Sequence, residues 1–134
     1  MSAWLLARRL APLVTAAAAA LALAGCGPEY DHTDIVSVKA PPKPLDGRVN
    51  YARIHVSVGA IVTARIVSYD DDRKEMAAGL RAKDPTVVEV TGVVTPGDYA
   101  FLGLRPGETD VEILADGKLV LILTAVVTEQ PPPP

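Results

Sequence analysis

Apolar and polar residues alternate in short runs between residues 48 and 128. Ile54, Val56 and Val58 alternate with polar residues, and after Gly59 the apolar positions 62, 64 and 66 do the same. With a period of two residues, alternate side chains lie on opposite faces of a β-strand. Together with further β-rich runs, the pattern predicts about seven short strands, the later ones at 80–82, 86–91, 99–104, 109–114 and 118–128.

Turn signals separate these runs. Asp116-Gly117 stands between two apolar segments and predicts a two-residue hairpin loop. Asp84 before Pro85 can form a hydrogen bond with its own backbone and so open a turn. Gly107 after Pro106 is expected to take a positive φ in a type II turn.

Three places depart from simple alternation. Val49 and Tyr51 are out of phase with the next strand, which predicts a bulge near Ala52. Residues 73–82 could form one short helical turn. The last strand is apolar on both faces over 119–123, so its second face needs a cover. The N-terminal tether or a sheet-end contact could provide it, or the face could be a docking surface for a partner.

Composition supports an all-β fold. Residues 48–128 contain 14 Val, 5 Ile and 7 Thr, and β-branched side chains favour strands over helices. Many short strands without helical intervals predict a single β-sandwich. We therefore divide the chain into a leader at 1–25, a flexible tether at 26–47, the sandwich at 48–128 and a Pro-rich tail at 129–134.

The first 25 residues differ sharply from the rest, since 19 are apolar. Arg8 and Arg9 precede an uncharged apolar stretch at 10–24, which is short for a membrane span of roughly 20 residues. A basic start, a short apolar segment and small residues at its end are typical of an export signal peptide.

The segment Leu23-Ala24-Gly25-Cys26 resembles the lipobox of bacterial lipoproteins and contains the only Cys of the chain. The resemblance implies cleavage before Cys26, a diacylglycerol on its sulfur and an acylated (palmitate-type) amino terminus. Such a protein is held on the membrane by its lipid without crossing it. Because Gly27 rather than Asp follows, the resemblance implies the outer membrane. An ordinary secretory signal with an incidental Cys is the alternative.

The tether and the tail are both rich in proline. Residues 26–47 include Pro41, Pro42 and Pro44 and show little periodicity, which predicts a semi-extended tether. A short edge strand at 34–39, with Val36 and Val38 on one face, is the alternative. The final four prolines predict an extended polyproline II end, which could be a frayed terminus, a spacer or a ligand for an aromatic groove.

Three motifs occur in a recognisable order: VSVG at 56–59, KDPTVVEV at 83–90 and LGLRPGETDVEI at 102–113. They resemble the bacterial immunoglobulin-like domain, group 2 (Big domain), over roughly 54–127. The resemblance implies an immunoglobulin-like β-sandwich of a kind found in adhesins and other envelope proteins. It departs from the family at Leu80, where a Trp is frequent, and in a longer, more charged loop at 69–76. The same region is similar to the N-terminal domain of pilus-assembly secretins.

Charge and chemistry exclude several classes of function. Without residues 1–25 the chain has 11 basic and 16 acidic residues, net −5, which argues against a nucleic-acid partner. A single Cys permits no internal disulfide and no cysteine-rich metal site. His32 and His55 are expected to be surface side chains, and no nucleophile motif surrounds Ser57 or Ser68. We expect no catalytic residues and no cofactor.

One acidic cluster remains. Asp70, Asp71 and Asp72 with Glu75 offer hard oxygen ligands that could hold Ca²⁺, although the spacing of an EF-hand is absent. A solvated loop balanced by Arg73 and Lys74 is the competing interpretation.

These features predict a lipid-anchored envelope protein in the periplasm or at the cell surface. Its membrane contact is the lipid on Cys26, and its sandwich is expected to act as a non-catalytic interaction or structural module for a protein or glycan. The alternative function is an accessory lipoprotein of a secretin, pilus or secretion machine.

Overall fold

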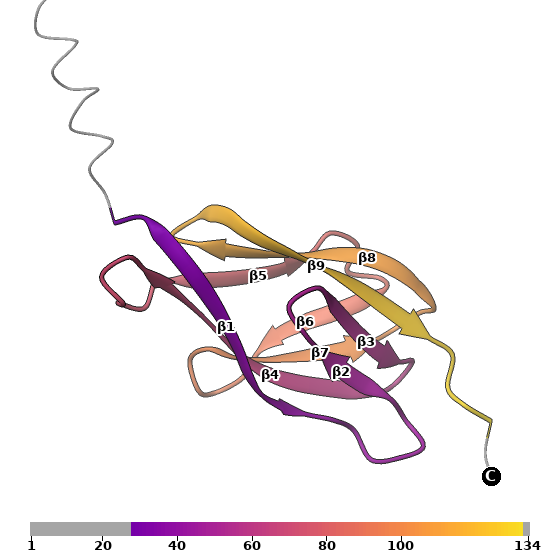
Figure 1. Ribbon diagram of the computed structural model, residues 1–134. Helices are drawn as coiled ribbons and strands as arrows, with labels where there is room; N and C mark the ends of the chain where they lie inside the picture. Colours follow the sequence, from indigo (N-terminus) through magenta and orange to yellow (C-terminus); the bar gives the residue numbers. More distant parts are fainter. Residues whose placement is uncertain (1–27, 133–134) are drawn as a thin grey trace, which may run out of the picture.

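The computed structural model describes residues 28–132, which form two β-sheets packed face to face (Figure 1). In this part of the chain there is no helix, and hence none that could cross a membrane. The strands are β1 (Tyr30–Lys39), β2 (Gly47–Val49), β3 (Arg53–Ser57), β4 (Ile61–Asp70), β5 (Ala78–Ala82), β6 (Val88–Gly92), β7 (Asp98–Gly103), β8 (Gly107–Ala115) and β9 (Lys118–Thr128).

The strand order is that of an immunoglobulin-like sandwich. One sheet has the order β1-β4-β7-β6 and the other β2-β3-β9-β8-β5. Across the first sheet, β1, β4, β7 and β6 correspond to strands A, B, E and D of the immunoglobulin fold. In the second sheet, β9, β8 and β5 correspond to strands G, F and C. The strand β3 adds to the edge of β9 in parallel, while the other pairs are antiparallel. The predicted fold class is confirmed, with nine strands instead of about seven.

The core lies between the sheets and follows the alternation in the sequence. Phe101, the only Phe of the chain, is fully buried at its centre. Burying such side chains removes apolar surface from water, which is the main stabilising term of the fold. The other fully buried large apolar residues are Ile54, Val56, Val62, Ile66, Val88, Val111, Ile113 and Leu123.

The hairpin at Asp116-Gly117 is confirmed. Both residues have positive φ, 49° and 79°, as a type I′ turn requires. The turn joins β8 to β9, whose pairing runs from Ala115–Lys118 to Gly107–Val127. The predicted strand at 118–128 coincides with β9.

The predicted tether is wrong for residues 30–39, which form β1 and pair with β4. The inward side chains of this strand include a polar one: Thr33 is 7% exposed, and its Oγ1 lies 2.8 Å from Ser68 Oγ in a hydrogen bond. The alternative of an edge strand at 34–39 agrees with the structure, in which β1 is an edge strand that begins four residues earlier. Only Pro28 and Glu29 of the described chain precede the strand.

Two further local predictions are wrong. Instead of a bulge at Ala52, β2 and β3 form an antiparallel hairpin. Its turn is closed by Asn50 Oδ1, which accepts hydrogen bonds from Ala52 N at 2.8 Å and Arg53 N at 2.7 Å. The chain reverses direction at this turn, so the change of phase after Val49 and Tyr51 marks a turn and not a bulge. The possible helical turn at 73–82 is also absent, since residues 78–82 pair with β8 as strand β5.

The Pro106-Gly107 turn follows its prediction in part. Gly107 has the positive φ that was predicted, but its value of 152° is far from the value near +80° of a type II turn.

The second face of β9 is left open by the described residues. Leu119 and Ile122 are 50% and 47% exposed. The segment that was expected to cover them, as part of the tether, is strand β1 of the opposite sheet.

Candidate functional site

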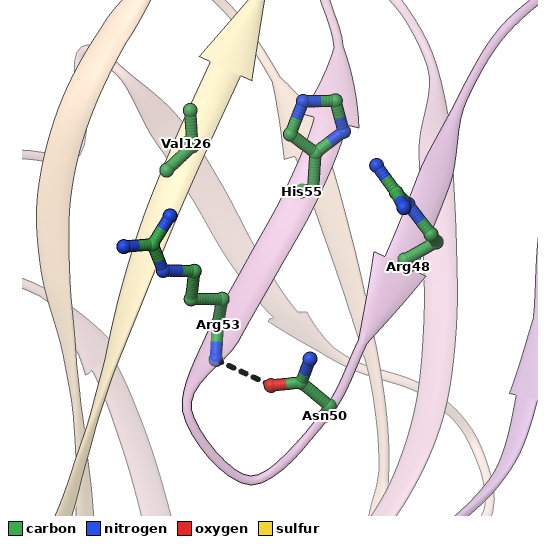
Figure 2. A pocket seen from close by; sticks show the side chains of 5 residues that line it. All are labelled: Arg48, Asn50, Arg53, His55 and Val126. Carbon is green, nitrogen blue, oxygen red and sulfur yellow. Dashed lines mark hydrogen bonds between the residues drawn. The ribbon is translucent and has the colours of Figure 1, made fainter.

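A basic pocket lies on the outer face of the β2–β3 hairpin and the adjoining part of β9 (Figure 2). It has a volume of about 270 Å³ and is lined by Arg48, Asn50, Arg53, His55 and Val126. Alternation explains this arrangement, because Ile54 and Val56 of β3 point into the core and the residues between them point outward. We call these five lining residues the basic pocket.

Sheet register brings the pocket residues together from distant parts of the chain. Arg48 lies opposite His55 in the β2–β3 pair, and His55 lies beside Val126 in the parallel β3–β9 pair. The three side chains therefore form one row across the sheet. Arg53 lies beside Thr124 one row away, and its guanidinium extends over β9 (Figure 2).

Two carboxylates lie at the pocket: Asp46 contacts its basic residues, and Glu108 lies opposite Val126 in the β8–β9 pair. Asp46 Oδ2 lies 3.2 Å from Arg48 Nη2 and 3.1 Å from His55 Nδ1. The second contact has the distance of an ion pair but not the angles of a hydrogen bond, so the buried Nδ1 atom has no hydrogen-bond partner. Because Arg48 is 70% exposed, its ion pair with Asp46 contributes little to stability.

The pocket retains free hydrogen-bond donors. Within residues 28–132, Arg53 has no carboxylate at ion-pair distance. Asn50 uses its oxygen to close the hairpin turn, which leaves its NH₂ group as a donor. Guanidinium and amide donors suit carboxylate or phosphate oxygens. The wall of the hollow itself is mainly apolar, so these donors suit an anionic group at its rim.

The other His is on the opposite sheet, in β1. The ring of His32 stacks on Tyr69 with centroids 5.0 Å apart, and its Nδ1 lies 2.6 Å from Asp31 Oδ2. Its side chain is 45% exposed. The structure thus places the two His residues, both expected at the surface, on different sheets and does not combine them in one site.

The acidic cluster is a loop between β4 and β5. One carboxylate oxygen each of Asp70, Asp71 and Asp72 lies within 4.8 Å of the others, and Glu75 does not belong to this group. Asp70 is 6% exposed, and its Oδ1 accepts hydrogen bonds from Asp72 N and Lys74 N, both at 2.9 Å. Through these bonds the Asp70 carboxylate closes the loop. The solvated loop stays the prediction for this segment, with Ca²⁺ binding as its alternative.

Turn chemistry accounts for the Asp-Pro motif. Asp84 Oδ1 accepts a hydrogen bond from the backbone N of Thr86 at 3.0 Å, as predicted, and a second one from Thr86 Oγ1 at 2.6 Å. These bonds, with a smaller effect of the Arg105 charge, lower the pKa of Asp84 below its ordinary value. This part of the motif therefore has a structural role.

Cys26, the predicted lipidation site, lies outside the described residues, as do the leader and the last two prolines. The basic pocket, in contrast, was not predicted from the sequence: alternation places Arg53 and His55 on the polar side of their strand but does not bring Arg48, Asn50 or Val126 to them. The sequence does contain one signal for the pocket, because basic residues, Arg48 and Arg53, stand at outward positions on either side of the turn at Asn50.

Comparison with known proteins supports the fold. No protein-family model matches the sequence, and no curated protein matches it. Solved structures of the S-layer protein SbsC are similar in fold. Domains 4 and 5 of that protein match with 14% identity and a TM-score of 0.54, over 76% of this chain and 54% of that chain. A structure of its domains 1–6 matches with 14% identity and a TM-score of 0.55, over 79% of this chain and 14% of that chain.

The chain thus spans about half or less of these neighbours. At 14% identity the likeness shows a shared β-sandwich architecture and does not transfer a function.

Proposed function

We propose that this chain is an exported lipoprotein, anchored through Cys26 to the cell envelope, most simply at the outer membrane. Its immunoglobulin-like sandwich is a non-catalytic module that binds a protein or glycan partner. The observation that carries the proposal is the position of the lipobox, which ends only four residues before the first strand of the folded domain. Lipid anchor and binding module thus follow one another directly.

Two structural features support this assignment. The neighbours in fold are domains of a surface-layer protein, which belongs to the cell envelope. The basic pocket, with Arg53 uncommitted and Arg48 at its edge, gives the module a place to engage an acidic group of its partner. Both fit a binding role better than a catalytic one.

Lipidation is tested by fractionation and labelled-palmitate incorporation, comparing the full-length chain with Cys26→Ser. We expect the unsubstituted chain in the membrane fraction with label, and the variant unlabelled and released. Gly25→Ala keeps a small residue before the Cys and serves as the matched control, which should remain labelled. Equal labelling of the Cys26→Ser chain would refute the anchor.

Partner binding is tested by crosslinking on intact membranes and recovery of the lipidated chain. Arg48→Ala combined with Arg53→Ala should lower recovery of the partner several-fold, because both guanidiniums are lost. Lys83→Ala is the control, since this exposed cation lies away from the pocket. A secretin or pilin among the recovered proteins would favour the accessory role, and unchanged recovery with the double variant would refute the pocket as the contact.

A further inference from the structure

Four segments meet at the end of the sandwich where β1 begins, here called the N-terminal end: the start of β1, loop 71–77, loop 93–97 and the turn Asp116-Gly117 (Figure 1). Backbone hydrogen bonds connect loop 71–77 to the start of β1 and to the turn Asp116-Gly117. Asp71 N donates to Glu29 O at 3.0 Å, and Asp116 N donates to Ala77 O at 2.8 Å. Loop 93–97 lies beside them, since Pro96 and Gly97 line one hollow together with Met76 and Ala77.

The chain between the predicted lipid and this end is very short. Tyr30 is already paired with Asp70 in the sheet, so four residue steps separate it from Cys26. At about 3.5 Å per residue, the reach is about 14 Å even when fully extended. This reach is a small fraction of the distance that the expected tether of 22 residues, 26–47, would span. A lipid on Cys26 therefore keeps the N-terminal end close to the bilayer surface.

Exposed apolar side chains occur at this same end. Val94, in loop 93–97, is 99% exposed and Val93 beside it is 45% exposed. Leu119, two residues after the hairpin turn, is 50% exposed, and it lies opposite Leu114 in the β8–β9 pair. Single exposed apolar residues are common, but here loop 93–97 and the start of β9 both expose them at the end to which the anchor confines the domain.

We propose that the N-terminal end of the sandwich docks on the lipid surface, with Val94 and Leu119 entering the interface. This inference rests on the proposed lipidation of Cys26. The occupant is lipid because the reach of about 14 Å leaves little room for a folded partner between this end and the membrane. Val94 and Leu119 then lose contact with water at little cost, since the anchor has already confined the domain.

Charge defines the kind of lipid surface that suits this end. Loop 71–77 and the adjoining turn contribute Asp71, Asp72, Glu75 and Asp116 against Arg73, Lys74 and Lys118, and the start of β1 adds Glu29, Asp31 and Asp34. An acidic excess of this kind is repelled by anionic headgroups. The docking is therefore apolar and favours a zwitterionic surface.

The test uses Trp reporters, because the only Trp of the chain is Trp4 in the leader, so the mature protein has none. The lipidated protein carrying Leu119→Trp or Val94→Trp is reconstituted into phosphatidylcholine vesicles. We expect a blue-shifted emission and at least twofold quenching by brominated phosphatidylcholine. Leu104→Trp is the matched control, because Leu104 is 41% exposed at the opposite end of the sandwich; it should remain unquenched.

Two further measurements separate the possible failures. Sedimentation with the vesicles reports the anchor, so loss of sedimentation would refute the lipidation and the docking together. Sedimentation with unquenched reporters at 119 and 94 would refute the docking alone. Inserting ten Gly and Ser residues after Gly27 should reduce quenching, because a longer linker lowers the effective concentration of the end at the surface. Replacing part of the lipid by phosphatidylglycerol should reduce it at low salt; an increase would refute the apolar mode.

Discussion

Gly103 is a position where the backbone of the sandwich leaves no room for an added atom. It ends β7, and a Cβ placed there would lie 2.5 Å from the backbone oxygen of Ser57 and 3.1 Å from Val127 Cγ1. The Gly103 N–H donates to Ala60 O at 3.1 Å, while its carbonyl accepts from Gly59 N at 2.8 Å. The backbone of the β3–β4 connection is therefore fixed against this glycine and cannot give way without losing these bonds.

We expect Gly103→Ala to destabilise the fold by overpacking. Inserting a methyl group into such a contact typically costs about 1–3 kcal/mol. For a domain of this size, each kcal/mol corresponds to a fall in thermal midpoint of about 4–8 °C. The cost comes from steric contact, since Gly103 does not have a positive φ.

Urea unfolding followed by circular dichroism would measure this loss, with Gly92→Ala as the control. Gly92 ends β6, opposite Tyr99 in the same β6–β7 pair, and nothing lies within 4 Å of its added Cβ. The control should stay within about 0.5 kcal/mol of the unsubstituted protein. If the two alanine variants have the same free energy of unfolding, the argument from close approach is refuted.

Three other predictions concern polar groups. Asp70→Ala leaves Asp72 N and Lys74 N without their acceptor and should cost about 1–3 kcal/mol in chemical denaturation, whereas Asp72→Ala, at an exposed carboxylate, should cost much less. Because its hydrogen bonds with Thr86 hold the pKa of Asp84 below the ordinary 3.8, the stability that this group contributes is present above that value and is lost as pH falls through the folded-state pKa. Asp84→Asn should flatten this part of the acid dependence of the thermal midpoint, and an unaltered profile would contradict the assignment. Millimolar Ca²⁺ should leave the thermal midpoint unchanged, since backbone amides already occupy the buried carboxylate of the acidic loop; a concentration-dependent rise would reveal a cation site instead.

Local patterns predicted the strands whose inward faces are mostly apolar and missed β1, where one of the two buried side chains is polar. The bounds of β9 follow from its apolar run and from the turn before it. In β1, by contrast, Thr33 faces inward because Ser68, 35 positions later, supplies its hydrogen bond. A partner so distant in sequence leaves no trace in the local alternation, which is why this segment was assigned to a tether.

The basic pocket was hidden for a related reason. Alternation already placed His55 outward, but Arg48 joins it only because β2 and β3 form a hairpin, which the change of phase suggested as a bulge. The position of Val126 beside His55 depends on a parallel pairing across 71 residues. Parallel neighbours are joined by long connections, so no short motif signals them.

The central place of β9 also has a consequence for how the molecule folds. This strand is the last along the chain, yet it lies between β3 and β8 in its sheet. Until residues 118–128 have been synthesised, both neighbours present unpaired edges that can join other chains. The sheet is therefore completed late, through contacts of long sequence separation that slow folding. A chain interrupted before Lys118 would lose not one peripheral strand but the seam that joins two parts of the sheet.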